Sequence, residues 1–225
     1  MPAQAAPLIF SVEGNIGSGK STLVRDLQVR MGAAPTLCGR QVVFLQEPVD
    51  IWNDTVDGDG ESILSKFYAD QEKYAFPFQM MAYISRQSLI NRAVADHPGA
   101  ILVSERCIHT DKQVFAKMLF EDGKIEPINY TIYNMWFDEF SNSARYAGHI
   151  YLEASASTCS SRIAKRGRTG EDIPLEYLGR CNDYHDTWLV DRPSTLRIDA
   201  NDDSDNQSHC DAVLAYIKET AGGAT

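Results

Sequence analysis

A glycine-rich segment near the amino terminus has the residue types needed to hold a nucleoside triphosphate. It matches G-x-x-x-x-G-K-[ST] in the order Gly14-Asn15-Ile16-Gly17-Ser18-Gly19-Lys20-Ser21, with Thr22 next. Glycines there let backbone N–H groups converge on phosphate oxygens, while Lys20 supplies a positive charge and Ser21 a hydroxyl ligand for Mg²⁺. An apolar run before the motif and a helical pattern after it fit its usual context. The segment predicts a nucleoside triphosphate site, but by itself it does not distinguish a hydrolase from a kinase.

Two further apolar runs end in charged residues. Glu47 ends the first run and is followed by Pro48, which cannot continue a central strand. Glu105 and Arg106 end the second run. Parallel sheets bind ligands at the carboxyl ends of their strands. A glutamate there can accept a proton from an attacking hydroxyl, and a neighbouring Glu and Arg can serve Mg²⁺ and a transferring phosphoryl group. The alternatives are a surface glutamate and a surface ion pair.

Four basic residues within seven positions stand out in this acidic chain: Arg162, Lys165, Arg166 and Arg168. Phosphoryl transfer needs positive charge that closes over the γ-phosphate from outside the glycine-rich loop. Arg162 and Arg166 are four residues apart and would share one helix face. The segment predicts an arginine-rich lid over about 162–173, with a solvated basic face as the alternative.

Residues suited to a nucleobase pocket lie on and near two predicted helices: Trp52, Phe78, Gln79, Ala82, Arg86, Asp111 and Phe115. On the first helix the polar side chains fall on one stripe, and on the second Asp111 and Phe115 share a face. An amide, a guanidinium, a carboxylate and aromatic rings provide the stacking and hydrogen bonds that a base requires. Spacing alone, however, favours a core role for the aromatic residues.

The elements that would position these residues alternate between strands and helices. Apolar runs predict buried strands at 8–13, 41–47, 100–104, 149–154 and 194–199. Helical spacing predicts helices at 21–30, 77–95, 111–121, 131–143 and 157–166. This order predicts a single α/β domain over 1–225, with a five-stranded parallel sheet covered on both faces. We expect surface loops at 53–62 and 201–208 and a frayed tail at 221–225.

Composition excludes several classes of protein. The 225 residues include 21 Lys and Arg against 31 Asp and Glu, and the net charge of −10 argues against a nucleic-acid binder. Apolar runs are too short for a membrane span, and the first residues resemble neither a secretory signal nor an organellar presequence, so we expect a cytoplasmic protein. Five scattered cysteines, with no C-x-x-C pair and no Cys/His cluster along the chain, predict reduced structural thiols.

In combination these segments resemble the deoxyribonucleoside kinases of the deoxycytidine kinase and deoxyguanosine kinase family over about 8–218. The resemblance is carried by Glu13 with the glycine-rich loop, Glu47-Pro48-Val49 with Trp52, Phe76-Pro77-Phe78-Gln79, Glu105-Arg106 with Asp111, Thr131-Ile132-Tyr133 with Trp136, the basic segment 162–168, and Ile173-Pro174-Leu175-Glu176-Tyr177-Leu178 with Trp188-Leu189. It implies a P-loop kinase fold and a reaction in nucleotide salvage, in which ATP with Mg²⁺ phosphorylates the 5′-hydroxyl of a deoxyribonucleoside.

The resemblance also implies a role for each site residue. Glu47 would accept the hydroxyl proton, Arg106 would lie beside Glu47 and the 5′-oxygen, and Ser21 and Glu105 would serve Mg²⁺. The glycine-rich loop with Lys20 would hold the ATP phosphates, and Arg162, Arg166 and Arg168 would close on them. On the nucleoside side, Tyr68 and Glu171 would bind the sugar 3′-hydroxyl, Gln79 would pair with the base edge, Phe115 would stack on the base, and Phe78 and Trp52 would wall the pocket.

Substrate choice and assembly also follow from the resemblance. Ala82, Arg86 and Asp111 together resemble the members that accept deoxycytidine and purine deoxynucleosides. A charged Arg86–Asp111 pair can donate to and accept from an amino-bearing base, so we expect deoxycytidine, deoxyadenosine or deoxyguanosine to be favoured over thymidine. The family is typically homodimeric, and the helices predicted at 77–95 and 131–143 are the candidates for that interface.

Two alternatives differ in the acceptor. A nucleoside monophosphate kinase, such as a thymidylate kinase, would need a basic pocket for the acceptor phosphate, whereas the carboxylate of Glu47 would repel it. A non-catalytic nucleotide-binding module or GTPase-type switch would carry guanine-recognition motifs and a water-positioning glutamine, and the sequence shows neither.

Overall fold

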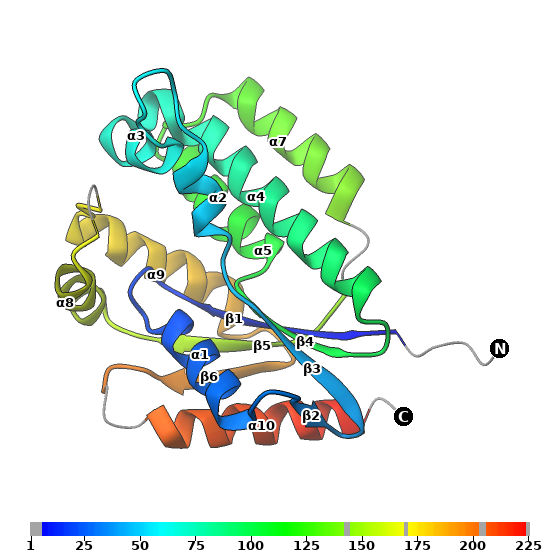
Figure 1. Ribbon diagram of the computed structural model, residues 1–225. Coiled ribbons are helices and arrows are strands. Elements are labelled where there is room, and N and C mark those ends of the chain that lie inside the picture. The colour runs from blue at the N-terminus through cyan, green and yellow to red at the C-terminus, as the bar shows by residue number, and fades with distance from the viewer. Residues whose placement is uncertain (1–5, 142–144, 169–170, 203–205, 224–225) are drawn as a thin grey trace.

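A twisted, mostly parallel sheet forms the centre of the molecule (Figure 1). The structure is a computed structural model that describes residues 6–141, 145–168, 171–202 and 206–223. Within these residues six strands form one sheet in the order β2-β3-β4-β1-β5-β6. The strands are β1 (Leu8–Gly14), β2 (Thr36–Leu37), β3 (Arg40–Leu45), β4 (Ile101–Glu105), β5 (Tyr146–Glu153) and β6 (Thr195–Asp199).

The predicted five-stranded parallel sheet is confirmed, with one small addition. β3, β4, β1, β5 and β6 pair in parallel. The sixth strand, β2, is only two residues long and pairs antiparallel with β3 at the sheet edge. Its shortness explains why no apolar run in the sequence marked it.

The central strand β1 separates two hydrophobic cores. Phe10 and Val12 point into the first core, and Ile9 points into the second. Side chains alternate between the two faces of a strand, so Ser11 and Glu13 share the face of Ile9. Both are fully buried. Two polar side chains therefore lie under the second face, next to the start of the glycine-rich loop.

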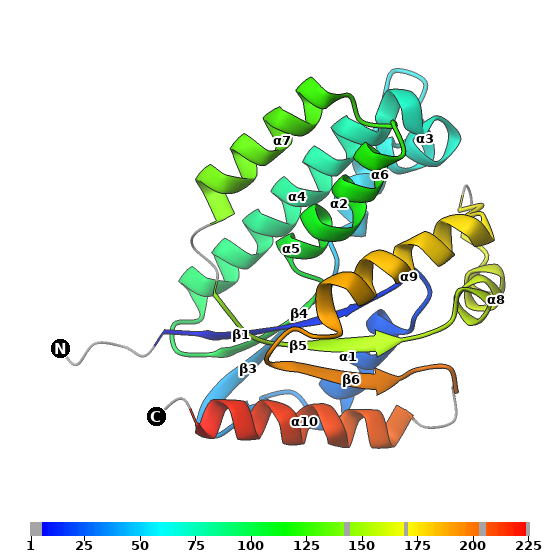
Figure 2. The ribbon, with the colours of Figure 1, turned by 180° about the vertical axis from the view of Figure 1, so that it is seen from behind.

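Helices α1 (Lys20–Met31) and α10 (Asn206–Gly222) cover the first face (Figure 2). They pack against each other and against β1, β5 and β6. The predicted frayed tail is wrong for its first residues, because α10 continues to Gly222 and Ala221 is buried in the core. The predicted loop at 201–208 likewise ends early, since α10 begins at Asn206. Residues 203–205 and 224–225 lie outside the described residues.

The second face is covered by α4 (Gln71–Asp96) and α9 (Leu175–Leu189), and α7 (Pro127–Phe140) packs on the outside of α4 (Figures 1 and 2). The predicted helix at 77–95 begins too late. Asp70 caps α4 by accepting a hydrogen bond from the N–H of Lys73 at 3.1 Å, and Pro77 lies inside the helix. The predicted helix at 131–143 begins instead at Pro127, at the first position of α7, where a proline is well tolerated.

Shorter helices surround the carboxyl ends of the strands: α2 (Val49–Asp54), α3 (Ile63–Ala69), α5 (Ile108–Thr110), η1 (Asp111–Ala116), α6 (Lys117–Glu121) and α8 (Ala156–Arg166). The predicted helix at 111–121 is divided, because η1 is a π-helical segment and only α6 continues as an α-helix. Such segments often occur at functional sites. None of the helices in the described part of the chain is long and apolar enough to cross a bilayer.

Candidate active site

The glycine-rich loop connects β1 to α1 in a conformation that only glycine fits at two positions. Gly14 has a φ of +138°, and a Cβ there would lie 2.6 Å from the carbonyl oxygen of Leu152. Gly17 has a φ of +79°, and its Cβ would lie 2.7 Å from the carbonyl oxygen of Cys159. Both contacts are with backbone that cannot move aside, so the two glycines allow the loop to wind closely between β5 and α8.

Asn15 attaches the loop to α9. Its Nδ2 donates to the carbonyl oxygen of Leu178 at 2.7 Å and to Oδ1 of Asn182 at 2.6 Å, while its own Oδ1 accepts from the N–H of Ile16 at 2.8 Å. These bonds use the whole amide of a buried side chain. The loop is therefore held in shape by the helix that follows the lid.

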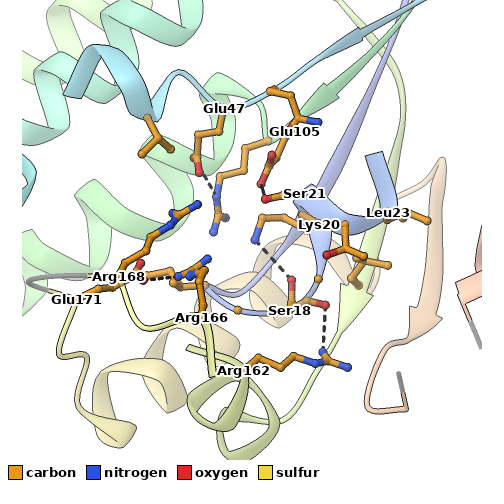
Figure 3. Close-up of a pocket in the computed structure, with 18 of the residues that line it drawn as sticks. Ser18, Lys20, Ser21, Leu23, Glu47, Glu105, Arg162, Arg166, Arg168 and Glu171 are labelled. Carbon is orange, nitrogen blue, oxygen red and sulfur yellow. Dashed lines mark hydrogen bonds and ion pairs between the residues drawn. The ribbon is translucent and has the colours of Figure 1, made fainter. Parts of the chain in front are cut away.

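Lys20 and Ser21 begin α1 and face the carboxyl ends of the strands (Figure 3). Nζ of Lys20 donates to the carbonyl oxygen of Asn15 at 2.5 Å. Burial, together with the positive charge of Arg106, lowers the pKa of Lys20 to about 7. Ser21 Oγ donates to Oε1 of Glu105 at 2.6 Å. A hydroxyl and a carboxylate are the oxygen ligands that Mg²⁺ takes in nucleotide sites, so this pair fits the predicted metal.

Glu47 lies two residues after β3, which ends at Leu45 and so is shorter than the predicted strand at 41–47, and two arginines flank its carboxylate. Its Oε1 is 2.8 Å from Nη2 of Arg86 and 3.4 Å from Nε of Arg106. Burial opposes ionisation of Glu47, but Arg86, Arg106 and Lys20 outweigh it and lower the pKa of this carboxyl below its usual value. Glu47 is therefore a carboxylate at neutral pH.

Arg86 connects Glu47 to Asp111. Its Nε donates to Oδ2 of Asp111 at 2.9 Å, and its Nη1 donates to the carbonyl oxygen of Glu105 at 3.1 Å. Burial disfavours its charge, yet Asp111 and Glu47 raise the pKa of Arg86 well above the usual value. One fully buried guanidinium thus holds both carboxylates, which sequence reasoning treated separately.

Arg106 has an unusual backbone and a fixed side chain. Its φ is +61°, in the left-handed region that a non-glycine residue rarely adopts, and its carbonyl oxygen accepts from Oγ of Ser104 at 2.8 Å. Its guanidinium lies 4.8 Å from the ring centre of Phe115. Its Nη1 is 3.4 Å from Nε2 of His185 in α9, and Nδ1 of that histidine lies 2.6 Å from the carbonyl oxygen of Cys181. The carbonyl fixes the proton on Nδ1, so Nε2 accepts from Arg106.

The part of the cavity predicted to hold the nucleoside is lined by aromatic rings. Trp52 and Phe78 meet edge to face with ring centres 5.5 Å apart, and Phe67 stacks on Phe78 at 4.5 Å. The indole N–H of Trp52 donates to Oγ of Ser85 at 2.9 Å. Gln79 is 2% exposed, and its Oε1 has no hydrogen-bond partner within the described residues. A buried amide at an aromatic wall is suited to reading a base edge.

The arginines of the predicted lid lie across from the loop (Figure 3). Arg162, in α8, donates from Nη1 to the carbonyl oxygen of Ser18 at 3.3 Å. Arg166 forms an ion pair with Glu171 at 2.5 Å. Arg168 follows the end of α8 and also lines the cavity. Residues 169–170 of the predicted lid lie outside the described residues, and its first part, 162–166, is the end of α8.

Nearly all the predicted site residues line one cavity of about 690 Å³. Its lining includes Ile16, Gly17, Ser18, Gly19, Lys20, Ser21, Thr22, Glu47, Trp52, Tyr68, Phe78, Gln79, Ala82, Arg86, Glu105, Arg106, Asp111, Phe115, Arg162, Arg166, Arg168 and Glu171. Gly14 and Asn15 are not part of the lining, and they shape the loop from behind. The size suits a nucleoside together with the phosphates of a nucleotide.

Sequence reasoning missed several residues of the site. Phe67 and Tyr177 line the cavity, and His185 contacts Arg106 from outside it. Tyr177 belongs to a segment that supports the family resemblance, which was a usable signal. Phe67 and His185 carried none, because α3 and α9 were not predicted as helices.

Comparisons with known proteins agree with this geometry. A model of the family described as deoxynucleoside kinase matches residues 10–221. Human deoxycytidine kinase is 34% identical over 211 residues, which cover 84% of this chain and 78% of that protein. Chicken deoxycytidine kinase 2 is 32% identical over 84% of this chain and 76% of its own length. A probable deoxycytidine kinase of fowlpox virus is 32% identical over 92% of this chain and 86% of its own length.

Proposed function

The chain belongs to the deoxynucleoside kinase family, and from this premise we propose that it transfers the γ-phosphoryl group of ATP to the 5′-hydroxyl of a deoxyribonucleoside. The observation that carries the proposal is the placement of Glu47. Its carboxylate lies in the same cavity as Lys20 and Ser21, between two arginines. An acceptor hydroxyl bound at Glu47 would face phosphates held by the loop.

On the donor side, the loop and the lid supply positive charge to the triphosphate. Lys20 and the N–H groups at the start of α1 would hold the phosphates from below, and Arg162, Arg166 and Arg168 would contact them from α8 and the segment after it. Ser21 and Glu105 would hold Mg²⁺, which neutralises charge on the phosphate oxygens when bound.

On the acceptor side, Glu47 would orient the hydroxyl and take its proton. Phosphoryl transfer passes through a loose transition state, so the hydroxyl needs little activation before attack and its proton can leave late. A carboxylate held ionised by Arg86 and Arg106 suits this role, because it accepts a hydrogen bond at neutral pH. Arg106 would in addition lie beside the transferring phosphoryl group. Tyr68 and Glu171 would bind the 3′-hydroxyl, and both line the same cavity.

For the base, we propose that deoxycytidine, deoxyadenosine or deoxyguanosine is favoured over thymidine. Gln79, Arg86 and Asp111 offer donors and acceptors at one end of the cavity, with Ala82 leaving room beside them and Phe115 available for stacking. The relatives named for deoxycytidine support including deoxycytidine in this set.

We further propose a homodimer through the outer helices of the second face. Large apolar side chains of α4 and α7 are exposed there: Ile84, Ile128, Ile132, Met135, Trp136 and Phe140. Six large apolar side chains exposed together are unusual on the surface of a monomer and typical of a protein–protein interface.

A phosphotransfer assay with Mg²⁺ and ATP tests the function. The purified protein is given deoxycytidine, deoxyadenosine, deoxyguanosine, thymidine and the matching monophosphates, and ADP and the phosphorylated product are quantified together. We expect turnover of nucleosides, with thymidine the poorest. Turnover of monophosphates alone would replace the proposal with a nucleoside monophosphate kinase, and ATP hydrolysis without dependence on an acceptor would leave only the nucleotide site.

A further inference from the structure

Three potential metal ligands meet behind the glycine-rich loop, outside the cavity described above. They are Glu13 in β1, Cys107 after β4 and His149 in β5, and one ligand atom from each lies within 4.8 Å of the others. All three side chains are buried, with exposures of 0%, 0% and 3%. They are separated by 94 and 42 positions in the sequence, counting from 13 to 107 and from 107 to 149.

The carboxyl of Glu13 has only part of the surroundings that a buried acid requires. Its Oε2 accepts from Oγ1 of Thr110 at 2.5 Å, whereas its Oε1 has no oxygen or nitrogen donor within the described residues, and the thiol of Cys107 is the other group that interacts with this carboxyl. Among these residues, no lysine or arginine forms an ion pair with it. A carboxylate buried in this way is costly unless a positive charge compensates it. A buried carboxyl that faces the thiol of Cys107 and no basic side chain therefore points to a cation.

His149 is oriented as a metal-binding histidine would be. Its Nδ1 lies 2.8 Å from Oγ of Ser11, and its ring packs between Tyr146 and Trp188 at centre distances of 5.9 and 5.5 Å. Fixed orientation by a second partner is characteristic of histidines that ligate metals.

We propose that Glu13, Cys107 and His149 bind a divalent transition-metal ion, of which Zn²⁺ fits this donor set best. Zn²⁺ combines thiolate, imidazole and carboxylate ligands, whereas Mg²⁺ and Ca²⁺ take oxygen ligands. On binding, a Zn–S bond forms as the thiol proton of Cys107 leaves to solvent. One carboxylate and one thiolate then balance the two charges of the ion, so the buried site becomes neutral.

The geometry is close to that of such a site. Bonds of about 2.0–2.3 Å place the ligand atoms of a tetrahedral zinc about 3.5 Å apart, so these side chains need to approach by about 1 Å. The buried hydroxyl of Tyr146 lies near Cys107 and Glu13 and interacts with the backbone of Ile108. It is a candidate for the remaining coordination position.

A metal here would join three strands directly under the nucleotide site. Glu13 precedes Gly14 of the glycine-rich loop, Cys107 follows Arg106, and His149 belongs to the neighbouring strand. The ion would stabilise this region without touching substrate. Its role is structural and does not depend on the proposed kinase reaction.

Metal content and Co²⁺ spectroscopy test the proposal. Protein expressed with added zinc and passed through gel filtration is expected to hold about one zinc per chain by elemental mass spectrometry. Metal-free wild-type protein titrated with Co²⁺ is expected to show absorption from thiolate-to-cobalt charge transfer. Cys107→Ser should abolish that band and weaken the affinity for Co²⁺ at least tenfold. Cys210→Ser, a buried cysteine of α10 on the opposite face, serves as the matched control and should retain both.

Two results would overturn the proposal. The first is wild-type protein that holds no zinc above background and shows no charge-transfer band with Co²⁺. The second is a Cys107→Ser variant that binds as the wild type does, which would place the ion elsewhere. Because the wild-type titration requires no substitution, the test remains decisive even if a variant fails to fold.

Discussion

At the scale of single residues, Arg86 connects two functions that looked independent along the chain. Its guanidinium contacts Glu47 at 2.8 Å and Asp111 at 2.9 Å while fully buried. The side chain proposed to read the base therefore also holds the side chain proposed to take the hydroxyl proton. A base that disturbs Arg86 would disturb Glu47 as well, so base selectivity is expected in turnover and not only in binding.

The first prediction concerns Glu47. Glu47→Gln keeps the shape of the side chain but removes its charge and its ability to take a proton, so kcat should fall by a factor on the order of 10² or more with nucleoside affinity largely kept. Steady-state kinetics and equilibrium binding measure the two effects. Glu139→Gln, on the exposed side of α7, is the control and should leave both unchanged. Unchanged kcat in Glu47→Gln would remove this residue from the mechanism.

The second prediction concerns base selectivity. In a protein carrying both Arg86→Met and Asp111→Ala, the ratio of kcat/KM for thymidine to kcat/KM for deoxycytidine should rise by about 10-fold or more, because the charged pair no longer penalises thymidine. Absolute rates should fall for every nucleoside, since Glu47 loses Arg86. Arg92→Met, at an exposed position of α4, is the control. Retained discrimination against thymidine in the double variant would mean that other residues read the base.

The third prediction concerns His185, which positions Arg106 through Nε2. His185→Leu leaves a buried guanidinium donor without its acceptor, a loss of about 1–3 kcal/mol, so kcat should fall about 10-fold with KM for the nucleoside nearly unchanged. His185→Gln offers an amide oxygen in its place and should recover most of the activity. Equal losses in the two variants would indicate a packing role alone.

At the scale of elements, α4 contributes side chains to the cavity on one side and, together with α7, to the protein surface on the other. The inner side of α4 provides Phe78, Gln79 and Arg86 to the cavity. Its outer side, with α7, exposes the apolar side chains proposed to form the dimer interface. The helix proposed to read the base would thus be held from behind by a second copy of the chain.

The fourth prediction follows from this surface. Wild-type protein should have twice the chain mass of 25.1 kDa in light scattering. A protein with Met135→Glu and Trp136→Glu, which are 66% and 46% exposed, should be a monomer because the charges cannot be desolvated at an interface. Val29→Glu alters an exposed apolar residue of α1 on the opposite face and is the control. A wild-type monomer, or a dimer that survives the two substitutions, would contradict the assignment.

At the scale of the whole molecule, buried neutral histidines couple stability to pH. Burial and the charge of Arg106 lower the pKa of His185 well below its usual value. An unfolded chain binds a proton at this side chain near pH 6.5, whereas the folded chain does so only at much lower pH. Protons therefore favour unfolding as the pH falls below about 6.5.

The fifth prediction states the size of this effect. Above about pH 7, protonation of His185 should not change the free energy of unfolding. Below pH 6.5 it should lower that free energy by up to about 1.4 kcal/mol for each pH unit. Urea unfolding of the wild type and of His185→Leu between pH 7.5 and 5.5 measures this effect. The slope of the free energy of unfolding against pH should be smaller in the variant, by an amount that corresponds to nearly one proton. Parallel slopes would show that His185 does not titrate in this way.

The sequence by itself determined the features that depend on neighbours along the chain. The glycine-rich loop, the five parallel strands and the acidic residues at the strand ends are local patterns, and almost every predicted site residue lines one cavity because parallel strands end at one edge of the sheet. The start of α4 was misplaced because Pro77 resembles a helix start, while the cap of Asp70 uses the backbone N–H of residue 73, which almost any residue there would provide.

Only the tertiary structure decided which distant side chains meet. The pairing of Arg86 with Glu47 joins residues 39 positions apart, and the contact of His185 with Arg106 joins residues 79 positions apart. Glu13, Cys107 and His149 form no cluster along the sequence, yet they converge because β1 lies between β4 and β5. Local spacing fixes which face of an element a residue occupies, whereas the partner on that face is set by the order of the strands in the sheet and by the helices packed on it.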